Sequence, residues 1–357
     1  MRRTSILAVL ICSLATPRLL RAQTPARIIL FVADGAGAGY WTAATLTVDS
    51  LAVQAMPVLG LVETGSADRI VTFSAEAATA FATGVRTFFN GIGVGPDSQP
   101  RTTVLEAAQA HGMSTGLVTT TELVDATPAA FAAHVANRQR SREIARQMAA
   151  HEVTVLLGGG RRAFESARLT DGQSVLTSLR QRYTYVENAA GLAGVQADTV
   201  TRLLGLFASG DMPLAPERRP SLATLARTAL AVLDRNPHGF FLMVETEETD
   251  TQGHHHAPFD VIASEMQAFD ETVRVGLEYQ RLHPETLVIV LGDHDTGGLA
   301  ILDDSAHTAP VAAYLTPNHS ANLVPLFAAG PGAEKFGGII RNDRIGQLLL
   351  QAVQAEH

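Results

Sequence analysis

The 357-residue sequence contains one cysteine, Cys12, in an N-terminal segment that we expect to be removed. The rest of the chain would then have no cysteine at all. This excludes disulfide bonds and thiolate chemistry. Any metal site must therefore be built from histidine and carboxylate side chains.

The sequence also lacks runs of basic residues. It has 27 lysines and arginines against 35 aspartates and glutamates, which gives a formal net charge of −8. No basic stripe is available to meet a nucleic-acid backbone, so we expect no specific nucleic-acid partner. Small phosphorylated substrates are not excluded, because a local metal cluster can outweigh the net charge.

The N-terminal apolar run, Ile6 to Ala15, is too short to span a bilayer as a helix. It follows Met1-Arg2-Arg3 and precedes small residues that end at Ala22. This pattern predicts a signal peptide over residues 1–22, with cleavage after Ala22 or, as the alternative, after Ala15. We expect a secreted or periplasmic protein without stable membrane insertion.

No internal repeat, low-complexity tract or linker follows, so residues 23–357 are predicted to form a single catalytic domain. Short apolar runs alternate with longer helical stretches. This alternation predicts an α/β fold, a three-layer α/β/α sandwich around a mostly parallel sheet. The predicted strands are 27–33, 115–119, 153–157, 240–244 and 286–291, and the clearest helices are 141–150 and 221–234.

Polar residues gather where these strands end. Asp34, Glu245 and the pair Asp293-His294 each follow a predicted strand. One acidic residue in such a place is more often a turn residue or a helix cap. Several together, with histidines nearby, favour a ligand site at the carboxyl edge of the sheet.

Three further positions could supply metal ligands. Asp250 and His254 are four residues apart, so one helical turn would place both on the same face. The alternative is a solvated acidic loop beside a chance histidine cluster. His319 taken alone would more often be an ordinary surface histidine.

Ser74 lies between a predicted strand and a helix of small residues, at the N-cap position. It could be only a cap. A hydroxyl at a helix N-terminus also meets free backbone N–H groups that favour an alkoxide and a bound phosphoryl group. No serine lies in a Gly-x-Ser-x-Gly motif, which disfavours an ordinary esterase.

A later segment offers oxygen ligands and a phosphate clamp. Asp125 and Thr127 are two residues apart and would point the same way in an extended segment, where they could bind Mg²⁺. Arg138 has the fork geometry to hold two phosphoryl oxygens.

Together these segments resemble the alkaline phosphatase family, in order from Asp34 to Gly330-Pro331-Gly332-Ala333. The most specific matches are Asp125-Ala-Thr127-Pro-Ala-Ala with His134 and Arg138, Thr83-Gly84-Val85-Arg86-Thr87, Leu156-Leu157-Gly158-Gly159-Gly160-Arg161 and Asp293-His294-Asp295-Thr296-Gly297-Gly298.

The resemblance implies a phosphomonoesterase with an alkaline phosphatase-like fold, two Zn²⁺ and one Mg²⁺. One zinc would be bound by Asp250, His254 and His319, and the second by Asp34, Asp293, His294 and Ser74. The magnesium would lie among Asp34, Thr127 and Glu245, with Asp125 in support. Ser74 would be the nucleophile that forms a phosphoserine, and Arg138 would hold the phosphate of monoester substrates or inorganic phosphate. Dimers are usual in the family, so a homodimer is one option that the residues themselves do not decide.

The sequence departs from the family pattern at three positions. Phe73 replaces the usual aspartate before the nucleophile, so we expect Arg138 to be less restrained and phosphate to bind more weakly. Glu76 replaces a small residue, and we expect it to face away from the phosphate or to meet Arg138. Thr251 replaces a Lys, His or Trp, which leaves the metal at the third site open.

Two choices remain at the level of the sequence. His307 is a rival to His319 as the last zinc ligand, although His319 keeps the family order. His255 and His256 are read as surface histidines.

Other functions are a phosphodiesterase or sulfatase of the same fold group, or a periplasmic protein that binds phosphate or metal without turnover. Only Phe73 points to the binding protein.

Overall fold

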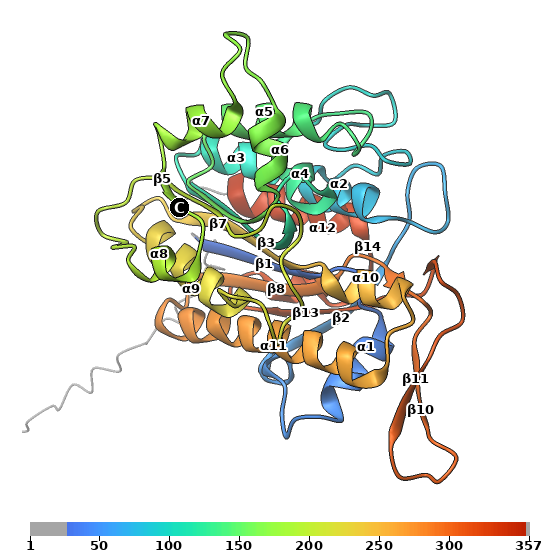
Figure 1. Ribbon diagram of the computed structural model, residues 1–357. Coiled ribbons are helices and arrows are strands. Elements are labelled where there is room, and N and C mark those ends of the chain that lie inside the picture. The colour runs from blue at the N-terminus through green and yellow to red at the C-terminus, as the bar shows by residue number, and fades with distance from the viewer. Residues whose placement is uncertain (1–26, 355–357) are drawn as a thin grey trace, which may run out of the picture.

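A ten-stranded sheet forms the centre of the molecule, with helices on both faces (Figure 1). The computed structural model describes residues 27–354, so the predicted signal peptide lies outside the described residues. In order across the sheet, the strands are β14 (Gly338–Arg341), β2 (Val58–Glu63), β13 (Val324–Ala329), β8 (Thr286–Gly292), β1 (Arg27–Ala33), β7 (Phe240–Thr246), β3 (Ser114–Glu122), β4 (Val155–Gly159), β6 (Leu203–Leu206) and β5 (Thr184–Val186).

Strand direction confirms the predicted mostly parallel sheet. Only β13 runs against its neighbours, pairing antiparallel with β8 and β2. The other pairs are parallel. The predicted α/β/α sandwich is therefore confirmed.

The residues of β1 show why the sheet is covered on both faces. Ile28 and Leu30 point into one apolar core, whereas Ile29 and Phe31 point into the other, and all four are fully buried. A continuous apolar run is typical of a strand that is buried on both sides.

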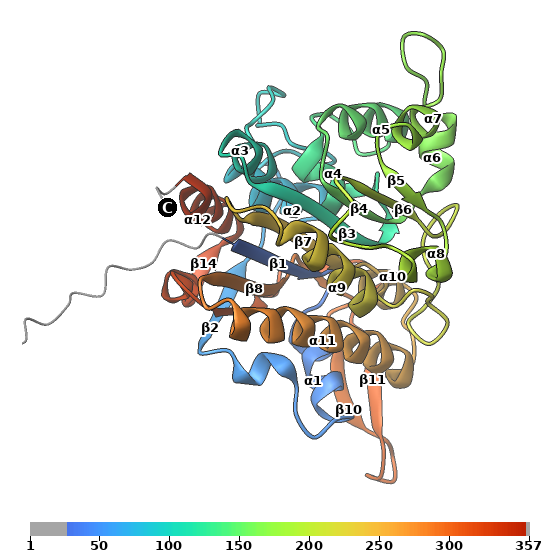
Figure 2. The ribbon, with the colours of Figure 1, turned by 90° about the vertical axis from the view of Figure 1, so that its left-hand side faces the viewer.

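The two helical layers are visible in Figure 2. The first core is lined by α2 (Ser74–Thr83), α3 (Val104–Ala110), α4 (Ala126–Ala132), α5 (Ser141–Ala150), α6 (Arg161–Ser166), α7 (Val175–Arg180) and α12 (Asn342–Gln354). The second is lined by α1 (Ala38–Thr45), α8 (Ala189–Ala193), α9 (Leu222–Leu233) and α11 (Phe259–Leu282), together with the short 3₁₀ turn Ala52–Ala55. Another 3₁₀ turn spans Ala333–Phe336.

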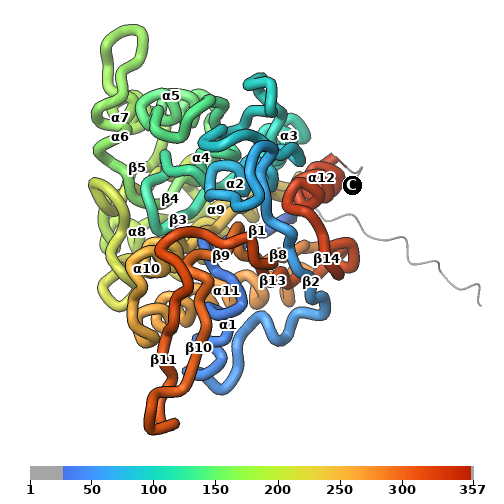
Figure 3. Tube along the Cα trace, turned by 90° about the vertical axis from the view of Figure 1, so that its right-hand side faces the viewer, coloured from blue at the N-terminus to red at the C-terminus, as the bar shows by residue number. Residues whose placement is uncertain are grey.

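Small elements complete the carboxyl edge of the sheet. Helix α10 (Glu248–His254) follows β7 directly. Strand β9 (Asp295–Thr296) pairs with β12 (His319–Ser320), and this pairing sets His319 opposite Thr296. A hairpin of β10 (Ala300–Asp303) and β11 (Pro310–Ala313) projects from the body (Figure 3).

Element bounds agree closely with the sequence analysis. Strand β1 and helix α5 have the predicted limits. Strand β7 continues two residues further than predicted, through Glu245 and Thr246. Among residues 27–354 there is no helix with the length and apolar character needed to cross a membrane.

Candidate active site

Three adjacent strands bring distant acidic residues to one edge of the sheet. In the register of β1, Val32 pairs with Glu245 of β7, and Ala33 pairs with Gly292 of β8. Asp34 and Asp293, which follow these strands directly, therefore lie side by side. Glu245 lies inside β7, one pleat back from the edge.

Asp34, Asp293 and His294 form a fully buried group of possible metal ligands. His294 Nε2 lies 3.2 Å from Asp34 Oδ1 and 3.3 Å from Asp293 Oδ2. Ser74 Oγ is 3.3 Å from the same nitrogen. The predicted nucleophile thus faces the predicted ligands of the second zinc.

Buried oxygens without a hydrogen bond and raised pKa values suit this group to a cation. Asp34 Oδ1 and Asp293 Oδ2 are buried and accept no hydrogen bond from the described residues. Burial, together with the neighbouring Asp293, raises the pKa of Asp34 well above its ordinary value. Burial and the nearby Asp250 raise the pKa of Asp293 to about 7. A bound cation reverses this effect, because it favours the charged carboxylate.

Asp250, His254 and His319 form a second group. Helix α10 places Asp250 and His254 one turn apart, as predicted, and His254 Nε2 lies 3.3 Å from Asp250 Oδ2. His319 Nε2 lies 3.3 Å from Asp250 Oδ1. The β9–β12 pairing supplies this third ligand from far along the chain.

The two imidazoles of this group face each other through their Nε2 atoms. His254 Nδ1 lies 2.7 Å from the Pro317 carbonyl, and His319 Nδ1 lies 2.9 Å from the Thr72 carbonyl. Each Nδ1 therefore carries a proton, and each Nε2 has a lone pair when its ring is neutral. The hydrogen bond with Asp250 raises the pKa of His254 to about 9, so without a cation the Nε2 of His254 also holds a proton. The two Nε2 atoms are 3.0 Å apart. A shared cation satisfies both lone pairs, and the backbone carbonyls orient the rings as in known metal sites.

The two groups are continuous. The rings of His294 and His319 stack with centroids 3.7 Å apart. Burial lowers the pKa of His294 well below its ordinary value, so this ring is a neutral ligand at working pH.

Thr127 and Glu245 provide oxygens for a third position. Thr127 Oγ1 and Glu245 Oε1 are buried without a hydrogen bond within residues 27–354. Thr119 donates to the other oxygen, Glu245 Oε2, at 2.6 Å. Burial raises the pKa of Glu245 to about 8. Oxygen ligands of this kind suit Mg²⁺.

Asp125 holds the predicted phosphate clamp. Arg138 Nη2 donates to Asp125 Oδ1 at 2.7 Å, and the Arg138 backbone N–H donates to the Asn90 carbonyl at 2.9 Å. Glu76 does not point to solvent: it is 1% exposed, and its Oε1 accepts from the Asn90 N–H at 2.8 Å. Glu76 and Arg138 therefore share the Asn90 turn without a direct bond between them.

Phe73 contributes a hydrophobic wall. Its ring packs at 4.4 Å from the ring of His319 and at 5.3 Å from that of Phe89. Phe73, rather than Ser74, is the N-cap residue, and helix α2 begins at Ser74 itself. The hydroxyl is still at the helix N-terminus, where the first N–H groups are free.

His307 and His319, the two candidates for the last zinc ligand, lie in different parts of the structure. His307 lies at the exposed tip of the β10–β11 hairpin, bonded to Asp303 at 3.2 Å. His255 and His256 are exposed, and His256 Nε2 contacts the Thr316 carbonyl at 3.0 Å. Thr251 donates to Glu247 at 2.6 Å.

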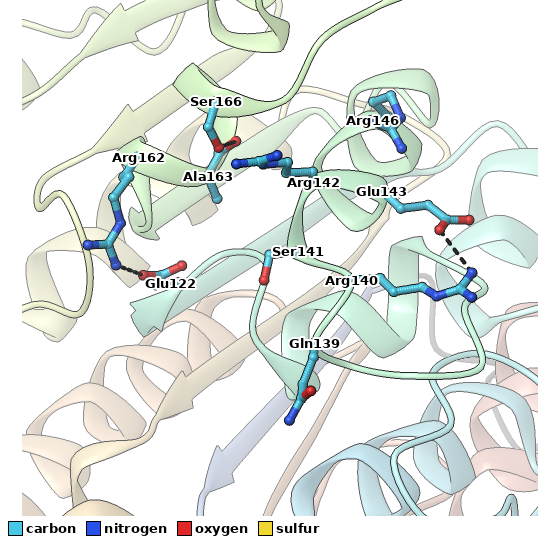
Figure 4. A pocket seen from close by; sticks show the side chains of 10 residues that line it. All are labelled: Glu122, Gln139, Arg140, Ser141, Arg142, Glu143, Arg146, Arg162, Ala163 and Ser166. Carbon is cyan, nitrogen blue, oxygen red and sulfur yellow. Dashed lines mark hydrogen bonds and ion pairs between the residues drawn. The ribbon is translucent and has the colours of Figure 1, made fainter.

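An arginine-lined cavity of about 640 Å³ lies beside the segment that carries Arg138, which we call the clamp segment (Figure 4). Arg140 pairs with Glu143 at 3.2 Å, and Arg162 pairs with Glu122 at 3.5 Å. Arg142 and Arg146 have no ion-pair partner among residues 27–354. The cavity is therefore locally cationic in a chain whose net charge is −8.

Several supporting residues escaped the sequence analysis. Thr119 orients Glu245, Thr296 bonds to Asp250, and Thr249 donates to the Asp34 carbonyl at 2.5 Å. The run of threonines at the end of β3 is the one signal that could have indicated Thr119.

Comparison with known proteins finds alkaline phosphatases among both sequences and solved structures. Residues 26–314 match the family model described as alkaline phosphatase. Alkaline phosphatase 3 of Bacillus subtilis is 32% identical over 332 residues, covering 86% of this chain and 69% of that one. Alkaline phosphatase of Escherichia coli is 33% identical, covering 80% of this chain and 73% of that one. The repressible alkaline phosphatase of Saccharomyces cerevisiae is 35% identical over 76% of this chain, which spans only 55% of the yeast enzyme.

Solved structures agree. Alkaline phosphatase from the Antarctic bacterium TAB5 superposes with a TM-score of 0.86 at 30% identity, covering 94% of this chain and all of that one. A variant of the TAB5 enzyme described with Mg bound in the M3 site gives a TM-score of 0.85 at 29% identity, with the same coverage. With a match over most of its length in sequence and in structure, the chain belongs to the alkaline phosphatase family.

Proposed function

We propose that the protein hydrolyses phosphate monoesters through a covalent phosphoserine on Ser74, at a site for two Zn²⁺ and one Mg²⁺. One observation carries the proposal: Ser74 Oγ lies 3.3 Å from His294 Nε2, beside buried carboxylate oxygens that have no hydrogen-bond donor. A hydroxyl among unsatisfied ligand atoms is suited to nucleophilic attack next to a cation.

The side chains fit the proposed cations. Asp250, His254 and His319 would hold one zinc; Asp34, Asp293 and His294 the other; and Thr127, Glu245 and Asp34 the magnesium, with Asp125 nearby. When bound, these ions supply positive charge that lowers the pKa of the serine hydroxyl and stabilises charge on the reacting oxygens.

The reaction itself uses three groups of the chain: Ser74, the first N–H groups of α2, and Arg138. Ser74 Oγ loses its proton to solvent and attacks phosphorus, an Oγ–P bond forms, and the bond from phosphorus to the ester oxygen breaks. The leaving oxygen takes up a proton from solvent and departs as the alcohol. The free N–H groups at the start of α2 favour the negatively charged phosphoryl oxygens. Arg138, held by Asp125, binds two of these oxygens. Water then attacks the phosphoserine, releasing inorganic phosphate and restoring the hydroxyl.

Export belongs to the same proposal. Residues 1–22 would be removed as a signal peptide, and residues 23–357 would act as one catalytic domain in the periplasm or outside the cell. The motif in residues 1–23 supports this view. N-terminal sequencing of the exported protein distinguishes cleavage after Ala22 from cleavage after Ala15.

The test compares p-nitrophenyl phosphate with bis-p-nitrophenyl phosphate at alkaline pH, with zinc and magnesium present. We expect strong monoester hydrolysis that falls by about three orders of magnitude or more in Ser74→Ala. EDTA should abolish it, and the remote variant Ser178→Ala should retain it. Preference for the diester would assign the protein to the phosphodiesterases. Phosphate binding without turnover would make it a binding protein.

A further inference from the structure

A third group of metal-type side chains lies away from the active-site cluster. Glu106 is in α3, His134 follows α4, and His151 caps the C-terminal end of α5. His134 Nε2 is 2.9 Å from Glu106 Oε1, and His151 Nε2 is 3.7 Å from the same oxygen. The three ligand atoms all lie within 4.8 Å of one another.

Hydrogen bonds orient two of the three side chains, His134 and Glu106. His134 Nδ1 lies 2.7 Å from the Gly93 carbonyl, so Nδ1 carries the proton and Nε2 faces Glu106. The two oxygens of the Glu106 carboxylate have different partners. Oε2 accepts a hydrogen bond from the Thr103 N–H at 2.8 Å, which leaves Oε1 for another partner. An imidazole fixed by a backbone carbonyl is the usual support of a metal ligand.

The spacing suits a tetrahedral ion. Ligand atoms about 2.0–2.1 Å from zinc are about 3.3 Å apart in a tetrahedron. The measured separations of 2.9 and 3.7 Å lie on either side of that value. The side chains are between 15% and 24% exposed, so an ion can enter and water can complete its coordination.

We propose that Glu106, His134 and His151 bind a divalent transition metal, zinc by the chemistry of two imidazoles and one carboxylate. The site would join three elements that are separate in sequence.

The alternative is an ion pair between protonated His134 and Glu106 with no metal. The two differ in zinc content, which is measured independently of phosphatase activity. Chelator-stripped full-length protein is loaded with zinc in the presence of magnesium, desalted and analysed for metal. We expect one zinc per chain fewer in His151→Gln than in the natural protein, and no loss in the control His111→Gln, whose ring caps α3 outside the group.

A second readout guards against an effect on folding. Cobalt replaces zinc with a visible spectrum that reports tetrahedral coordination, and His151→Gln should lose one of its components while hydrolysing p-nitrophenyl phosphate as before. Equal zinc content in the natural protein and His151→Gln would overturn the proposal and leave the ion pair as the role of these residues. If the natural protein did not hydrolyse p-nitrophenyl phosphate, the proposed function would be wrong, but the proposal of this metal site would not be affected.

Discussion

At the scale of single residues, the direction in which each polar atom faces defines the site. His254 and His319 each give one nitrogen to a backbone carbonyl and turn the other toward its neighbour at 3.0 Å. Without a cation, Asp250 raises the pKa of His254 to about 9, so a proton lies where a cation would bind both rings. Pairs of this kind identify a metal site more securely than sequence spacing does, because they fix the tautomers as well as the distances.

Phe73 directly precedes the proposed nucleophile, Ser74. Its ring packs on His319, and Asp125 is the carboxylate that bonds to Arg138. We expect Phe73→Asp to lower the inhibition constant of inorganic phosphate by about tenfold, the value of one charge-assisted hydrogen bond. Phe73→Leu, which removes the ring without adding charge, is the control. An unchanged constant in Phe73→Asp would refute this role.

Tyr183 links alkaline pH to stability. Its hydroxyl donates to the Val153 carbonyl at 2.9 Å, and burial raises its pKa to about 12. Because the folded pKa lies above the ordinary value of 10, the stabilisation is fully present below pH 10 and is lost as the pH rises toward 12. We expect the free energy of unfolding to fall over this window by up to about 2–3 kcal/mol more in the natural protein than in Tyr183→Phe. Parallel pH curves for the two proteins in urea titrations would contradict this.

At the scale of elements, a buried ion pair fastens a loop to helix α11. Arg218 Nη2 lies 3.0 Å from Glu265 Oε2, both side chains are 1% exposed, and the Ala215 N–H donates to Glu265 Oε1 at 2.6 Å. Removing one partner leaves a buried charge without compensation.

We therefore expect Arg218→Ala to lower the free energy of unfolding by about 3–5 kcal/mol. Arg341→Ala breaks an ion pair with Asp343 whose arginine is 54% exposed, and it should cost less than about 1 kcal/mol. Denaturant titrations measure both. Equal losses in the two variants would mean that the buried pair has no special weight.

Helix α5 contributes Arg142 and Arg146, two of the four arginines that line the cavity beside the clamp segment. Arg142 has no ion-pair partner among the described residues and lines the same cavity as Gln139, the neighbour of Arg138. We expect Arg142→Ala to raise KM about two- to fivefold for a hexose bisphosphate, with less effect at high salt. KM for p-nitrophenyl phosphate should not change, and the distant surface variant Arg344→Ala should leave both values as they are. A rise in KM for both substrates would assign Arg142 to the site itself.

At the scale of the whole molecule, continuous apolar runs made much of the fold predictable. The five predicted strands correspond to β1, β3, β4, β7 and β8, in the middle of the sheet. The strands that were missed lie toward its edges, or in β13 carry a proline. Strand β2 alternates exposed and buried residues, and β14 has no buried residue at all. Such strands form by pairing with neighbouring strands, and their own sequence shows only a weak strand pattern.

Some residues of the candidate site could likewise be predicted from the sequence, and others could not. Residues that follow a strand, such as Asp34 and Asp293, could be placed from the chain alone. The approach of His319 depends on the pairing of two-residue strands, which no local pattern predicts. The role of Thr119 depends on a contact across 126 residues. His319 could therefore be named as a ligand only through the family resemblance, and Thr119 was not predicted.

The central claim is that Ser74 carries the phosphoryl group during turnover. Metal-loaded protein is mixed with excess p-nitrophenyl phosphate, quenched in acid, digested and analysed by mass spectrometry. We expect one added phosphoryl group on the peptide that contains Ser74, none on that peptide in Ser74→Ala, and none without substrate. Rapid hydrolysis with no modified Ser74, or with the phosphoryl group on another residue, would contradict the account.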